Sequence, residues 1–166
     1  MGILPLLMVP FFAQSVVMGI DELHFHRARG LPFWERVGHP LDTLTIVACF
    51  AWTLLAPWSR PGLVVYVGLS LASCAFVTKD EPVHARCCAA GEHWLHAALF
   101  VLHPIVLGAA AALWAAQEGR APGWFGAAAW ARRALALELA ATIGFGLYQA
   151  IYWNAMRRHD GPTPQE

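Results

Sequence analysis

Charged side chains are scarce in this sequence, and lysine is almost absent. Asp, Glu, Lys and Arg make up 13% of the 166 residues, Lys79 is the only lysine, and the formal net charge is zero. A chain without a basic excess has no electrostatic means of holding a polyanion, so we do not expect nucleic acid as a partner. At 58% hydrophobic residues, the chain is far more apolar than an ordinary soluble domain.

The cysteines lack a recognisable pattern. Cys49, Cys74, Cys87 and Cys88 show none of the paired spacings typical of zinc ribbons or redox motifs. Cys49 and Cys74 lie inside apolar runs, where a thiol usually behaves as a small hydrophobic group. The sequence therefore indicates no thiolate metal site and does not require an oxidising compartment.

Long apolar runs are what the sequence has in abundance. A helix needs about 20 apolar residues to cross a bilayer, with about 17 as the practical minimum. Five stretches approach this length, at residues 3–20, 41–58, 62–77, 93–116 and 134–153. Five such helices in so short a chain leave no surface to face water. We predict an all-α polytopic membrane protein, with one transmembrane domain over residues 1–156, a bundle of four of the helices, and a polar tail over residues 157–166.

Histidines and carboxylates gather on one side of this arrangement. With five spans, the connections after the first and the third lie at the same membrane face, and seven of the eight histidines fall near that face. Ionisable groups near hydrocarbon are costly and are usually retained for function. The candidate metal ligands are Asp21, Glu22, His24, His26, His39, Asp42, Glu81, His84, Glu92, His93, His96 and His103.

The spacing of several of these residues supports a metal site. Residues three or four apart share one face of a helix. Glu81 and His84 are three apart, like the Glu-x-x-His pairs that hold two metals in carboxylate helix bundles. Glu92 and His96 are four apart, and His103 continues the same face about 10 Å deeper, at about 1.5 Å per residue.

The residue types also narrow the metal and its chemistry. Mixed imidazole and carboxylate ligands suit iron, manganese or zinc better than calcium or magnesium. The candidates exceed what one ion needs, so we expect two metal ions, with iron favoured and zinc or manganese as alternatives. Glu22, Glu81 and Glu92 are the candidate general bases. Three further residues lie at the near end of the last span and are candidate substrate contacts, namely Tyr148, Gln149 and Tyr152.

Purely structural explanations exist for individual residues. Thr78 to Glu81 has the form of a helix capping box. Asp42 follows Pro40 in a first helical turn, where an acid complements the helix dipole. Histidines at an interface can simply be hydrated. Each explanation accounts for one residue, and none accounts for the gathering of the histidines on one side.

The segment Glu92-His93-Trp94-Leu95-His96, at the mouth of a span, resembles the helix-end histidines of membrane di-iron oxidoreductases with histidine boxes, such as acyl desaturases and hydroxylases. The chain departs from that family in having no His-His pair and no His-x-x-x-His box. The resemblance implies an oxidoreductase that acts on a lipid-like or other apolar substrate and receives electrons from a donor protein.

Three other functions compete with this interpretation. A zinc ion in the same site would activate water for hydrolysis. A metal-ion carrier or sensor should have polar ligands at mid-membrane, and few polar residues lie that deep. A non-catalytic subunit binding haem through two facing histidines would need a second deep histidine besides His103, and the sequence offers none.

The loops predict an orientation, which can be tested directly. With the N-terminus outside, seven of the eleven basic residues lie inside, in what we expect to be a bacterial inner membrane. A reporter fused to the C-terminus should therefore report the cytoplasm. If it reports the outer compartment instead, the site belongs to the outer face.

Overall fold

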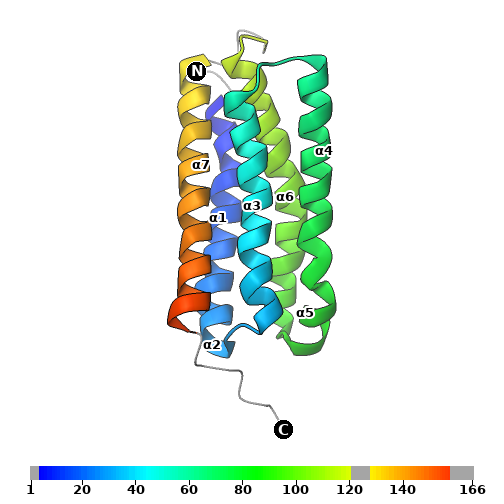
Figure 1. The fold of residues 1–166 in the computed structure, drawn as a ribbon, viewed down its shortest axis with the longest axis vertical. Helices are drawn as coiled ribbons and strands as arrows, with labels where there is room; N and C mark the ends of the chain where they lie inside the picture. The colour runs from blue at the N-terminus through cyan, green and yellow to red at the C-terminus, as the bar shows by residue number, and fades with distance from the viewer. Residues whose placement is uncertain (1–3, 121–127, 158–166) are drawn as a thin grey trace.

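The computed structural model describes residues 4–120 and 128–157, and within these ranges the chain is helical, with no strand. The predicted all-α class is confirmed. Among the described residues are five long helices. They run alongside one another in alternating directions (Figure 1). They are α1 (Val9–Ile20), α3 (Phe33–Leu55), α4 (Arg60–Phe76), α6 (Ala90–Gln117) and α7 (Ala128–Ile151). The shorter elements are η1 (Leu4–Met8), η2 (Asp21–His26), α2 (Arg27–Arg29), η3 (Val77–Asp80), α5 (Glu81–Cys87) and η5 (Tyr152–Met156).

Four helical stretches are long and apolar enough to cross a membrane. They are Pro5–Arg29, Arg60–Lys79, Ala90–Gln117 and Ala129–Met156. The structure thus fits an integral membrane protein, with four of the five predicted spans meeting this measure. The exception is α3, which has 23 residues but carries Glu35, Arg36 and Asp42 in its first half.

The outer surface of the bundle is apolar. Large side chains such as Phe12, Val64 and Leu137 are 73%, 72% and 67% exposed, respectively. A water-soluble bundle would cover such residues, because exposed apolar patches of this extent are a liability in water. Facing lipid tails, the same side chains carry no penalty.

The apolar core lies in the half of the bundle near the α3–α4 connection. Trp114 of α6 is fully buried, and its indole N–H donates to the carbonyl of Ala56 at 3.0 Å. The hydroxyl of Tyr66 on α4 donates to the carbonyl of Leu107 on α6 at 2.7 Å. A buried indole N–H or tyrosine hydroxyl needs a hydrogen-bond partner, and these two carbonyls supply one. The first contact joins α6 to the end of α3, and the second joins α4 to α6.

The alternating helix directions bring the predicted polar segments to one end of the bundle. The end of α1, the start of α3, the end of α4 and the start of α6 all lie at the end where α2 and α5 are drawn (Figure 1). The sequence placed a connection directly after residue 20, and this detail is wrong. The helix continues through η2 and α2 and ends only at Gly30, whose φ of 74° favours glycine.

Close packing between α3 and α7 depends on Gly146. A Cβ added there would lie 2.9 Å from Cγ2 of Thr43, too close without a shift, whereas a Cβ at Gly144 meets nothing within 4 Å. Alanine has an equal intrinsic advantage over glycine at both positions, of about 1 kcal/mol. We expect Gly146→Ala to unfold at a lower temperature than Gly144→Ala in detergent. Equal unfolding temperatures for the two variants would show that α7 can shift to accommodate the added methyl group, and that the close packing does not depend on Gly146.

Candidate metal centre

The polar end of the first helix is distorted in a way that gathers its ionisable groups. Residues Asp21–His26 form a π-helix, in which hydrogen bonds join residues five apart. The wider turn brings Asp21, Glu22 and His26 toward the interior together, and all three are buried. Such π-helical segments are frequent at functional sites.

The first ligand group joins this turn to the start of α6. One oxygen or nitrogen atom from each of Asp21, His26, Glu92 and His96 lies within 4.8 Å of the others, and all four residues are buried. Oδ2 of Asp21 lies 3.2 Å from Nε2 of His26 and 3.2 Å from Nε2 of His96. Oε1 of Glu92 lies 3.7 Å from Nε2 of His26. Two carboxylates and two imidazoles that converge in this way match the donor set of a divalent transition metal.

A second group lies beside the first and includes α3. His26, Glu35 and His39 also bring ligand atoms within 4.8 Å of one another. His84 of α5 adds a further donor, because its Nε2 lies 3.4 Å from Oε1 of Glu35. The Nδ1 atoms of His84 and His96 are 2.6 Å apart, so the two groups are in direct contact.

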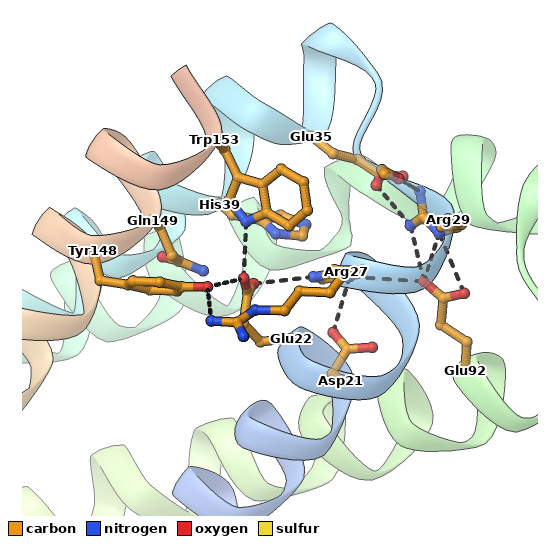
Figure 2. Close-up of polar contacts among 12 residues, drawn as sticks. Asp21, Glu22, Arg27, Arg29, Glu35, His39, Glu92, Tyr148, Gln149 and Trp153 are labelled. Atoms are coloured by element: carbon orange, nitrogen blue, oxygen red, sulfur yellow. Dashed lines mark hydrogen bonds and ion pairs between the residues drawn. The ribbon is translucent and has the colours of Figure 1, made fainter. Parts of the chain in front are cut away.

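Glu22 contacts the first group through His26 and is itself held by two aromatic residues. Its Oε2 lies 3.3 Å from Nδ1 of His26. Its Oε1 accepts from the Tyr148 hydroxyl at 2.7 Å and from the Trp153 indole N–H at 2.9 Å (Figure 2). Glu22 thus contacts Nδ1 of His26, while Nε2 of the same ring faces the other ligands. This carboxylate–histidine arrangement is the usual support of a metal-bound imidazole.

Arg29 links the two groups through their carboxylates. Its Nη2 lies 2.7 Å from Oε2 of Glu35 and 2.8 Å from Oε1 of Glu92, so the guanidinium bridges α3 and α6 (Figure 2). Burial favours the neutral form of Glu35, but the contacts with His84 and Arg29 outweigh burial and hold the pKa of this carboxyl below its ordinary value. Glu35 is therefore ionised although it is fully buried.

Charge and unpaired atoms both indicate that a cation fits here. Asp21, Glu22, Glu35 and Glu92 are all buried, and Arg29 neutralises only part of their charge. Buried carboxylates need compensation, which a divalent cation or protonated histidines would supply. Four buried atoms of the site make ion-pair contacts at most and no hydrogen bond, and these are Asp21 Oδ1, His26 Nε2, Glu35 Oε1 and His84 Nε2. Each is an atom type that binds metals.

Several predicted ligands lie outside both groups. His24 and Glu81 are exposed, and His93 is half-buried and belongs to neither group. Asp42 forms an ion pair with Lys79. His103 is buried, and its Nε2 lies 2.9 Å from the Ser73 hydroxyl.

The predicted substrate residues divide in a similar way. Gln149 lines a cavity beside the site, and its side-chain oxygen accepts from Thr43 at 2.8 Å. Tyr148 supports Glu22 instead, and Tyr152 stacks on Tyr148 with ring centroids 5.3 Å apart. The aromatic pair thus belongs to the supporting structure around Glu22.

Sequence reasoning missed three contributors. Glu35 and His39 are four apart, as are Glu22 and His26, so a search for repeated Glu-x-x-x-His spacing finds Glu35. Arg29 and Trp153 have no such spacing signal, because Arg29 contacts Glu92, 63 residues away, and Trp153 contacts Glu22, 131 residues away.

The cavity beside the two groups has a volume of about 120 Å³. Asp21, His26 and His96 are among the polar residues that line it, and apolar residues line it as well. The apolar residues are Met18, Ile46, Val77, Leu99, Phe100 and Phe145. A small apolar molecule can therefore lie next to the ligand atoms.

The fold and the site together define a helical bundle with a buried carboxylate–histidine centre at one end. No protein family, curated protein or solved structure matches this chain. The geometry of the site is therefore the basis for the functional argument.

The bridge formed by Arg29 generates a stability prediction. In the metal-free protein, Arg29→Met leaves Glu35 and Glu92 buried without their cation, which should lower the free energy of unfolding by roughly 3 to 5 kcal/mol. Arg27→Met is the matched control, since that guanidinium is exposed. Chemical unfolding in detergent gives both values. Similar losses in the two variants would contradict the bridging role.

Proposed function

We propose that this chain is an integral membrane metalloenzyme, an oxidoreductase that acts on a small apolar substrate at a carboxylate–histidine metal centre. The observation that carries the proposal is the convergence of four buried ligand groups, from Asp21, His26, Glu92 and His96, beside a cavity with an apolar wall. The site also has more buried carboxylates than Arg29 neutralises, and several of its ligand atoms make no hydrogen bond.

Two metal positions are proposed, one for each ligand group. Asp21, His26, Glu92 and His96 would hold the first ion. Glu35 and His39 of the second group, together with His84, would hold the second ion, and His26 lies between the two positions. A bundle that presents carboxylate–histidine pairs from several helices to two adjacent ions has the arrangement of carboxylate-bridged dinuclear proteins.

Iron is the metal that we favour. The donors are oxygen and nitrogen atoms, which suit iron, manganese and zinc. Cys88 is near the site, but burial raises the pKa of its thiol to about 12, so it supplies no thiolate at neutral pH. The absence of a thiolate from the proposed donors favours iron over a closed structural zinc site.

The reaction proposed is oxidation of the apolar substrate by dioxygen, the chemistry that bound iron supplies. One oxygen atom enters a C–H bond of the substrate and the other leaves as water, with two electrons from a donor protein and two protons. Glu22 fixes the orientation of His26, and Arg29 fixes Glu92. The apolar wall of the cavity positions the substrate and limits the entry of water.

The same proposal places the centre at the cytoplasmic face of the membrane. The described basic residues at the site end of the bundle are Arg27, Arg29, Arg36, Lys79 and Arg157. The opposite end has Arg60, Arg120, Arg132 and Arg133. An excess of basic residues is typical of the cytoplasmic side. In this proposal α3 also crosses the bilayer, because it lies alongside the four apolar helices over their length (Figure 1).

Metal content tests the proposal. The purified protein, reconstituted with ferrous iron under reducing conditions and without a metal-binding tag, should contain about two equivalents per chain. His96→Ala should lose at least one equivalent, because it removes a donor of the first group. His93→Ala, one turn away on the same helix and outside both groups, should retain both. Elemental analysis gives the counts.

The other outcomes discriminate between functions. One equivalent of zinc in the protein as isolated would favour a hydrolase over an oxidoreductase. Equal metal content in the His96→Ala and wild-type proteins would exclude His96 as a ligand. No bound metal in the wild-type protein would overturn the metalloenzyme proposal, and protonated histidines would then balance the buried carboxylates.

A further inference from the structure

A second cavity lies deeper in the bundle, next to the one beside the proposed metal centre. Its volume is about 210 Å³, and α1, α3, α6 and α7 all contribute to its walls. The two cavities have five lining residues in common, which are Gln14, Met18, Thr43, Ile46 and Phe145. The deeper cavity thus adjoins the cavity beside the site.

The deeper cavity opens between α1 and α7. Ser15 of α1 and Ala141 of α7 line it and are also exposed on the outer surface, so they mark its mouth. Its floor is formed by buried residues such as Phe50 and Val106. α3 packs closely along α7, and α1 along α6, whereas the backbones of α1 and α7 make few close contacts.

The position of this mouth determines what it faces. Ala141 lies 13 residues after the start of α7, or about 20 Å along the helix, and about 15 Å before its end at Ile151. Ser15 lies within the apolar stretch Pro5–Arg29. An opening at this depth in a membrane-spanning bundle faces lipid tails and not water.

The lining indicates the chemistry of a ligand. Phe11, Phe50 and Val106 give the cavity an apolar surface suited to an aliphatic chain, while the half-buried Glu138 and Thr142 of α7 add polar groups to its lining. Gln14 is only 7% exposed, lines both cavities, and its side-chain oxygen makes no hydrogen bond. A buried acceptor without a partner costs free energy, which a ligand hydroxyl or amide N–H would recover.

We infer that the α1–α7 opening is a lateral portal, through which an aliphatic molecule with one hydrogen-bond donor enters from the bilayer and reaches the metal centre. The hydrogen-bond donor of this molecule binds the side-chain oxygen of Gln14, and its aliphatic part occupies the deeper cavity. Met18 and Phe145 lie at the junction of the two cavities and set the passage between them. Arrival of the molecule at the metal centre rests on the proposed function. The portal itself and the binding of the aliphatic molecule in the deeper cavity do not.

Photolabelling tests the portal without requiring metal or activity. The probe is an eight-carbon alcohol with a diazirine in its chain, added to the protein in phospholipid vesicles. Mass spectrometry of the illuminated protein should find adducts on the buried Phe50 or Val106, and excess 1-octanol should suppress them. Ala141→Trp and, independently, Ser15→Trp should block these adducts. Ala140→Trp is the matched control, because Ala140 is exposed but does not line the cavity.

Gln14→Leu tests recognition of the donor. Loss of one buried hydrogen bond should weaken labelling by the alcohol roughly three- to tenfold, with no loss for the corresponding hydrocarbon diazirine. Adducts confined to lipid-facing residues such as Leu137 and Leu147, or buried adducts that persist in both tryptophan variants, would overturn the portal. Elemental analysis of the same samples reports the metal separately, so failure of the portal and failure of the metal centre remain distinguishable.

Discussion

Buried negative charge at one end of an apolar bundle is the constraint on which the rest of this structure depends. Asp21, Glu22, Glu35 and Glu92 are all buried, and ionised carboxylates in such surroundings need a compensating cation or strong hydrogen-bond donors. Arg29 meets part of this need by bridging two helices. The remaining need is the physical reason for proposing metal ions at this place.

The distortions of the helices follow from the same constraint. The structure describes two π-helical segments, η2 and η5, and they meet at Glu22, which accepts a hydrogen bond from Trp153 of η5. An undistorted first helix would spread Asp21, Glu22 and His26 over a wider arc. The π turn holds them together, and the hydrogen bonds to Glu22 stabilise it.

The outer surface and the cavities connect this centre to its surroundings. The apolar exterior fits a bilayer, and the opening between α1 and α7 lies within the apolar stretches of both helices. In the function proposed above, a substrate dissolved in lipid would reach the metal centre through this opening without crossing water.

The sequence by itself determined the helical class, the apolar stretches and the end at which histidines and carboxylates gather, because these depend on hydropathy and on the alternation of helix direction. It also indicated Glu92 and His96, since residues four apart share a helical face. Only the tertiary structure decided which candidates meet. Glu81 and His24 turn outward, whereas Glu35 and Arg29 join the site, because the rotation of each helix about its axis is set by packing against helices distant in the sequence. Hydropathy contains no information about that rotation.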